Sequence, residues 1–108
     1  MIAVLNGPVA GGGIGIALAA DFIIASDKAR FIPAFTKLGG MADCGTLYLM
    51  VQSIGPLKTK EIMMFNKNLE AREATDIGLY NLTVPHEDLS EEAHRILTEI
   101  ANGPTLAH

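Results

Sequence analysis

The amino-acid sequence predicts an α/β fold, in which strands and helices alternate along the chain. Two short apolar runs, Ile2–Leu5 and Phe22–Ser26, are bounded by turn residues, as strands usually are. A glycine-rich and then alanine-rich stretch separates these runs. Near the carboxyl end, apolar residues recur at helical spacing, with Ala93, Ile96, Leu97 and Ile100 expected on one helix face. This alternation is typical of an α/β domain.

Turn and cap residues divide the chain into its expected elements. Gly55 ends one helix, and Pro56 suits the first turn of the next because an N–H is not needed there. Gly78 stops a helix, and Pro85 ends a strand. In chain order we expect a strand at Ile2–Leu5, a helix at Gly12–Ala20, a strand at Phe22–Ser26, helices at Cys44–Ile54, Pro56–Phe65 and Glu70–Ile77, a strand at Tyr80–Val84 and a helix from about Ser90 to Ala101.

Composition points to a soluble, cytoplasmic protein. Of the 108 residues, 49% are hydrophobic and 19% charged, and the net charge of −4 argues against nucleic acid or an anionic membrane as a partner. The longest apolar stretch, Ile14–Ala25, is interrupted by Asp21 and is too short to span a bilayer. The sequence opens directly in a strand without a basic segment, so we expect no signal peptide. The single cysteine, Cys44, fits a reducing compartment and a packing role.

Three consecutive glycines carry the strongest chemical signal in the sequence. Gly11, Gly12 and Gly13 lie between an apolar strand and an alanine-rich helix. Without Cβ atoms they let backbone N–H groups approach a ligand closely. The start of the following helix adds roughly half a positive charge. This segment therefore predicts an anion hole, in which each donor contributes about 3 to 4 kcal/mol when it faces charge that develops in a transition state.

A dinucleotide-binding interpretation of the same glycines finds no further support. Gly7, Gly11 and Gly13 fit the G-x-x-x-G-x-G turn of short-chain dehydrogenases. Those enzymes also need a Tyr-x-x-x-Lys pair, but here Gln52 follows Tyr48 at that spacing. Val84 likewise follows Tyr80, and no Gly-Lys-Ser/Thr completes a P-loop.

An ordered series of motifs along nearly all 108 residues resembles the crotonase (enoyl-CoA hydratase/isomerase) superfamily. The series begins with Asn-Gly-x-x-x-Gly-Gly-Gly and an Asp, from Asn6 to Asp21. It continues with Ala-x-Phe at 29–31, Phe35–Gly39, Asp43–Thr46, Ile54-Gly55 and the segment Leu69–Pro85. Asn102–Thr105 is most similar to the enoyl-CoA isomerases of the phenylacetate pathway.

The resemblance implies a site with one oxyanion donor and one base. It assigns the N–H of Gly12 to the thioester oxygen and places the second N–H in an earlier loop that this chain lacks. The two glutamates of true hydratases would fall at Gly15 and Phe35, so hydration has no acid–base pair here. Asp43 takes the position of the isomerase base. The same aspartate could instead cap the helix expected from Cys44.

Other residues are expected to support the site or the core. The implied acyl pocket comprises Gly11, Gly13, Phe35, Leu38 and Met41, and burial beside the last three would raise the pKa of Asp43. Dehalogenases of the family carry an aspartate nucleophile at position 43, but they place a tryptophan where this chain has Phe35. Asp21 is expected to be structural. The methionines are expected to pack in the core or pocket: Met41, Met50, Met63 and Met64. His86, His94 and His108 lack metal-ligand spacing and are expected at the surface, so no metal is predicted.

Resemblance and length together predict a partial domain spanning residues 1–108. A crotonase subunit is a spiral of strand-strand-helix turns, and the resemblance implies that the N-terminal turns and the C-terminal trimerisation helices are missing here. One hypothesis is an acyl-CoA enzyme, most simply an isomerase, with coenzyme A entering only as part of the substrate. The other is a non-catalytic remnant that self-associates through an exposed strand edge. In either case we expect a homo-oligomer, and little turnover from the 108 residues alone.

Overall fold

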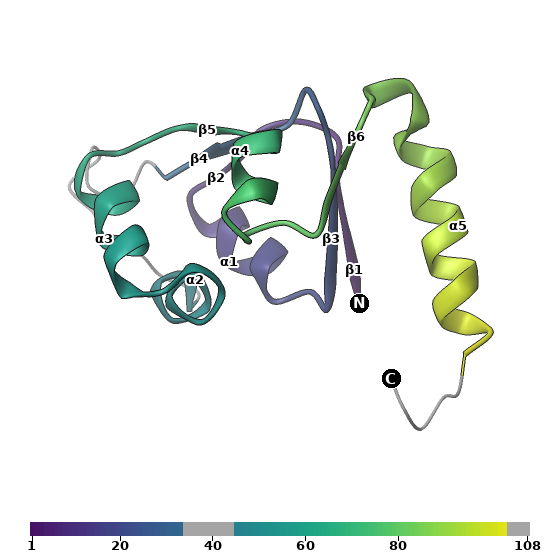
Figure 1. Ribbon diagram of the computed structural model, residues 1–108, viewed down its shortest axis with the longest axis horizontal. Coiled ribbons are helices and arrows are strands. Elements are labelled where there is room, and N and C mark those ends of the chain that lie inside the picture. Colours follow the sequence, from purple (N-terminus) through teal and green to yellow (C-terminus); the bar gives the residue numbers. More distant parts are fainter. Residues whose placement is uncertain (34–44, 104–108) are drawn as a thin grey trace.

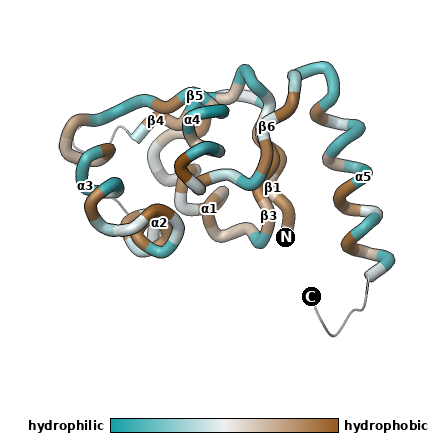
Figure 2. The backbone as a smooth tube through the Cα atoms, in the orientation of Figure 1, coloured by the Kyte–Doolittle hydropathy of each residue, from teal (hydrophilic) through white to brown (hydrophobic). Residues whose placement is uncertain are grey.

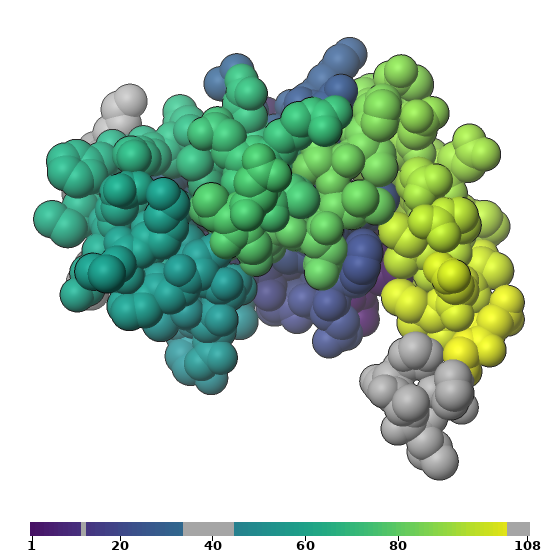
Figure 3. All heavy atoms as spheres, in the orientation of Figure 1, coloured from purple at the N-terminus to yellow at the C-terminus, as the bar shows by residue number. Residues whose placement is uncertain are grey.

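The computed structural model describes residues 1–33 and 45–103. Within these ranges the strands form two three-stranded sheets, and helices pack around both (Figure 1). The expected α/β class is confirmed. Figure 3 shows that the last helix forms one end of the molecule, whereas residues of the second and third helices form the other.

The first sheet contains β1 (Ile2–Leu5), β3 (Phe22–Ser26) and β6 (Leu82–Val84) in the order β1-β3-β6, with all strands parallel. Ile24 in the central strand lies opposite Val4 on one side and Leu82 on the other. Both faces of β3 are covered, which explains its unbroken apolar sequence. Among the described strands, none pairs with the outer edge of β1.

The second sheet is made of strands too short for sequence patterns to predict. It contains β2 (Val9–Ala10), β4 (Arg30–Ile32) and β5 (Leu69–Glu70), with β2 parallel and β5 antiparallel to β4. No strand was predicted between Ile2–Leu5 and the helix expected from Gly12, so β2 is an addition that the structure makes. The chain turns after β1, adds β2 to a second sheet and only then reaches the glycines.

The helices follow the expected order, with shifted ends. They are α1 (Gly12–Leu18), α2 (Thr46–Ile54), α3 (Pro56–Met64), α4 (Ala71–Asp76) and α5 (Leu89–Ala101), and a 3₁₀ turn at His86–Asp88 leads into α5. Gly55, with φ of 85°, separates α2 from α3, and Pro56 begins α3 as predicted. The strand expected at Tyr80–Val84 begins only at Leu82, because the N–H of Tyr80 donates to the carbonyl of Ala74 in α4 and not to a neighbouring strand.

The first sheet separates two cores, and the alternation of side chains along β3 assigns each residue to one of them. Ile23 and Ala25 face the larger core with residues of α1 to α4, whereas Ile24 packs with Val84, Leu89 and Ile96 under α5. In Figure 2 the strands of this sheet are hydrophobic, while α5 alternates between hydrophobic and hydrophilic positions. The amphipathic α5 therefore covers the second face of the sheet.

Some packing expectations fail. Met50 and Met63 are buried as predicted, but Met64 is 69% exposed because it lies on the outward face of α3, opposite Ile62. Leu97 is exposed, whereas its predicted companion Ile96 is buried. Met41 lies outside the described residues.

Candidate functional site

The predicted anion hole lies where β2 ends and α1 begins. Gly11 occupies the N-cap position of α1 with φ of 56° and ψ of −134°, a conformation that residues with a Cβ rarely adopt. Its carbonyl accepts a 3.1 Å hydrogen bond from the N–H of Ile14, which closes the first helical turn. A glycine is thus required here by the backbone itself.

The next two glycines bring N–H donors to the helix start. Gly12 and Gly13 are the first residues of α1, so their N–H groups have no acceptor within the helix. Gly11 has no side chain to cap them, and the first turn of α1 contains no acidic residue. A Cβ placed on Gly13 would lie 3.6 Å from Cγ2 of Val9, which is ordinary contact. This helix end can therefore donate hydrogen bonds to an anionic oxygen.

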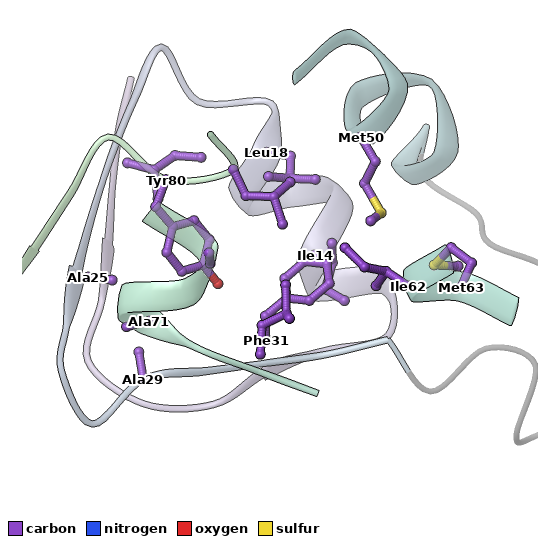
Figure 4. Packing of buried hydrophobic residues seen from close by; sticks show 14 residues of the cluster. Ile14, Leu18, Ala25, Ala29, Phe31, Met50, Ile62, Met63, Ala71 and Tyr80 are labelled. Atoms are coloured by element: carbon purple, nitrogen blue, oxygen red, sulfur yellow. The ribbon is translucent and has the colours of Figure 1, made fainter. Parts of the chain in front are cut away.

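Packing holds the glycine junction in place. Ile14, in the first turn of α1, is fully buried and lies beside Phe31 of β4 and Ile62 of α3 (Figure 4). Leu18 anchors the other end of α1 in the same core. On the other side of Gly11, β2 pairs with β4. Both β2 and α1 are therefore held against β4, the first by strand pairing and the second by core packing. A donor group preorganised in this way does not have to reorient during a reaction.

The structure brings together only part of the predicted site. Gly11, Gly12 and Gly13 are adjacent, as their sequence requires. Phe35, Leu38, Met41 and Asp43 lie outside the described residues, so their roles remain predictions. Gly15, where the resemblance would place one hydratase glutamate, is buried within α1.

Sequence reasoning missed a second feature, at the start of α2. Thr46 is fully buried, and its Oγ1 has no hydrogen-bond partner in the part of the chain that the structure describes. It follows Gly45, which has φ of 73° and serves as the N-cap residue. A hydroxyl residue directly after a glycine at an expected helix start is the signal that could have revealed this position.

The aspartate and histidine side chains singled out in the sequence lie away from the glycine junction in chain order, and each described one is at the surface. Asp21 accepts a 2.7 Å hydrogen bond from the Met1 ammonium, which lowers the pKa of its carboxyl. His86 is exposed as expected, yet its Nδ1 lies 2.7 Å from the buried hydroxyl of Ser26. His94 is also exposed, and His108 lies outside the described residues.

Within residues 1–33 and 45–103, His, Cys, Asp and Glu side chains form no group that could hold a metal ion. No helix in those ranges is long and apolar enough to cross a bilayer.

Comparisons with known proteins agree on one family. The sequence profile described as enoyl-CoA hydratase/isomerase matches residues 1–108. Among the relatives, a trans-2-decenoyl-[acyl-carrier-protein] isomerase of Streptococcus mutans is 38% identical over 98 residues, covering 91% of this chain and 37% of that protein. A 1,2-epoxyphenylacetyl-CoA isomerase of Escherichia coli is 32% identical over 105 residues, covering 97% of this chain and 40% of that protein.

Solved structures show the same fold. An enoyl-CoA hydratase from Mycobacterium avium subsp. paratuberculosis superimposes with a TM-score of 0.95 at 35% identity, covering 98% of this chain and 44% of that one. This chain therefore spans about two fifths of the length of the proteins it matches.

Proposed function

The chain belongs to the enoyl-CoA hydratase/isomerase family, and from this membership we propose that it acts on an acyl-CoA thioester by moving a carbon–carbon double bond. The observation that carries the proposal is the start of α1, where no side chain caps the N–H groups of Gly12 and Gly13. An enolate oxygen, which gains charge only as the reaction proceeds, suits such a donor.

One carboxylate suffices for the proposed chemistry. The Asp43 carboxylate takes a proton from C2 of a 3-enoyl thioester, and the electron pair moves onto the thioester oxygen as the enolate forms. The N–H of Gly12 stabilises that oxygen. The carboxylic acid then returns the proton to C4, and the double bond forms between C2 and C3. No atom is gained or lost, so neither water nor a second acid is required.

Gly15 and Phe35 favour isomerisation over hydration within the family. Neither residue can take or give a proton, although the resemblance places the two hydratase glutamates at these positions. Isomerisation needs only one carboxylate to move the proton, whereas addition of water needs an acid–base pair that these two positions do not supply. The alternative of a non-catalytic remnant is not favoured by any observation on the described residues.

The test is an assay of double-bond migration in a 3-enoyl-CoA thioester, made on this chain and on any longer form of the protein, with thioester binding measured in parallel. Asp43→Asn keeps the shape and a possible helix cap but removes the base. We expect turnover to fall by orders of magnitude while the dissociation constant changes little. Equal rates in wild type and variant would leave Asp43 as a cap only. Absence of both thioester binding and turnover would contradict the proposal.

A second pair of variants tests the donor at α1. Proline is tolerated at the first position of a helix but has no N–H, so Gly12→Pro removes the proposed donor specifically. Gly12→Ala also adds a Cβ but retains the N–H. We expect the proline variant to turn over about 10²- to 10³-fold more slowly than the alanine variant. Similar rates in the two variants would show that this N–H does not contact the reacting oxygen.

A further inference from the structure

Thr46 presents an unpaired hydroxyl at the start of α2. Its side chain is fully buried, and Oγ1 has no hydrogen-bond partner among the residues that the structure describes. Buried hydroxyl groups are normally satisfied. The buried Thr59, for comparison, donates a 2.7 Å hydrogen bond to the carbonyl of Gly55. Thr46 is therefore a buried donor whose acceptor the described chain does not supply.

The position of Thr46 places this donor beside others. It is the first residue of α2, a helix of nine residues, and Cα–Cβ bonds in a helix tilt toward its N-terminus. The hydroxyl thus lies at the helix end where the first N–H groups have no intrahelical acceptor. Gly45 cannot cap them with a side chain, and the first turn contains no acidic residue.

The donors and the partial positive charge at this helix end determine which kind of ligand atom is complementary to it. The hydroxyl and the N–H groups all donate, and the helix dipole adds partial positive charge. A carboxylate or carbonyl oxygen is complementary to such a group, whereas a cation or a second donor is not. This end belongs to α2, whereas the Gly11–Gly13 junction begins α1.

We propose that the N-terminus of α2 is a binding site for a carboxylate or carbonyl oxygen, with the Thr46 hydroxyl as its side-chain donor. The oxygen can come from the acyl group of a CoA thioester, in which case the site rests on the proposed function. It can equally come from a free carboxylate, which does not depend on that function. The two sources share one chemistry and are separated by experiment.

The experiment measures dissociation constants from the shift of the urea unfolding midpoint with probe concentration. The probes are acetyl-CoA and sodium acetate, the latter against sodium chloride at equal ionic strength. Thr46→Val removes the hydroxyl with little change in shape, and Thr46→Ser retains it. Thr59→Val is the matched control, since it removes a buried hydroxyl that already has an acceptor.

We expect at least one probe to bind wild type, Thr46→Ser and Thr59→Val with similar affinity. Thr46→Val should bind that probe at least tenfold more weakly, which corresponds to about 1.4 kcal/mol. Without any probe, Thr46→Val should unfold at a urea concentration no lower than wild type, because no bond within the protein is lost. Thr59→Val, in contrast, should unfold at a lower urea concentration.

Three results would overturn the inference. If acetyl-CoA binds wild type and Thr46→Val equally, and acetate binds neither, the proposed function stands and the α2 site does not. If no probe binds wild type, the inference fails. If Thr46→Val is destabilised without a probe as strongly as Thr59→Val, the hydroxyl already has a partner within the protein. Binding of acetate alone, lost in Thr46→Val, would support the α2 site without supporting the proposed function.

Discussion

Tyr80 packs its ring in the larger core but leaves its hydroxyl without a partner among the described residues. The residue is 3% exposed, and its ring lies near Leu18 and Phe31 (Figure 4). Burial raises the pKa of the phenol well above its usual value, so the group stays neutral. Burial of the apolar ring stabilises the fold, whereas burial of a hydroxyl without a hydrogen bond destabilises it.

Tyr80→Phe tests whether the buried hydroxyl destabilises the fold. The variant keeps the ring and removes only the unpaired hydroxyl, so we expect the free energy of unfolding to stay the same or to rise by about 1 kcal/mol. Urea unfolding followed by circular dichroism measures it. A loss of more than about 1 kcal/mol would show that the hydroxyl has a partner, such as a buried water.

Glu61 gives a pH-dependent prediction. Its carboxylate accepts 3.2 Å hydrogen bonds from Lys67 and Lys58, and these bonds lower its pKa. A carboxyl whose pKa is lower in the folded state stabilises the fold above its unfolded pKa. That contribution is lost as pH falls through the ordinary glutamate range toward the folded value.

Glu61→Gln should therefore show a smaller loss of unfolding free energy between pH 7 and pH 3 than wild type. Because all three side chains are solvent-exposed, high salt should reduce the difference. Chemical denaturation at the two pH values, in low and high sodium chloride, checks both points. Parallel pH profiles at low salt would mean that the ion pairs contribute nothing to stability.

At the level of elements, the boundary between α2 and α3 depends on one glycine. Gly55 has φ of 85° and ψ of 166°, a backbone region almost restricted to glycine. Its N–H bonds to the carbonyl of Val51, and its own carbonyl accepts from both the N–H and the hydroxyl of Thr59. This residue therefore ends one helix and caps the beginning of the next.

Gly55→Ala should lower the free energy of unfolding by about 1 to 3 kcal/mol, because alanine is strained in this conformation although no atom lies within 4 Å of its Cβ. Gly7→Ala is a matched control, since its Cβ also meets nothing within 4 Å and its φ is not positive. Thermal unfolding of both variants provides the comparison. Equal stability of the two would show that the strain at residue 55 relaxes.

For the molecule as a whole, we propose self-association through the exposed edge of β1. No described strand pairs with that edge, and Val4 of β1 is 45% exposed. Ile24 is fully buried and Phe22 packs against the core under α5. The edge, rather than the faces of the sheet, is thus the surface to test.

Sedimentation velocity should show oligomers for wild type and a shift toward monomer for Val4→Lys, because a charge on an edge strand opposes strand pairing. Leu57→Lys is the control, since Leu57 is 82% exposed on α3 and lies outside the first sheet. A stable monomer in the wild-type protein would refute the proposal. An equal effect of the two lysines would indicate association through general hydrophobicity instead.

Local sequence determined the elements whose signals are complete within a few residues. The strands at Ile2–Leu5 and Phe22–Ser26 were predicted with the observed bounds, and Gly55-Pro56 marked the break between two helices. The glycine triplet likewise marked a helix start without a side-chain cap, because its conformational freedom is a local property. Family membership followed from the order of such local motifs.

Tertiary structure decided what depends on partners distant in the chain. The two-residue strands β2 and β5 exist only because β4 lies between them, so no periodicity could reveal them. The exposure of Met64 and Leu97 depends on which face of each helix meets the core, and an apolar side chain alone does not specify that. The unpaired hydroxyl of Thr46 is a further case, because hydrogen-bond satisfaction is a property of the three-dimensional surroundings and not of the residue.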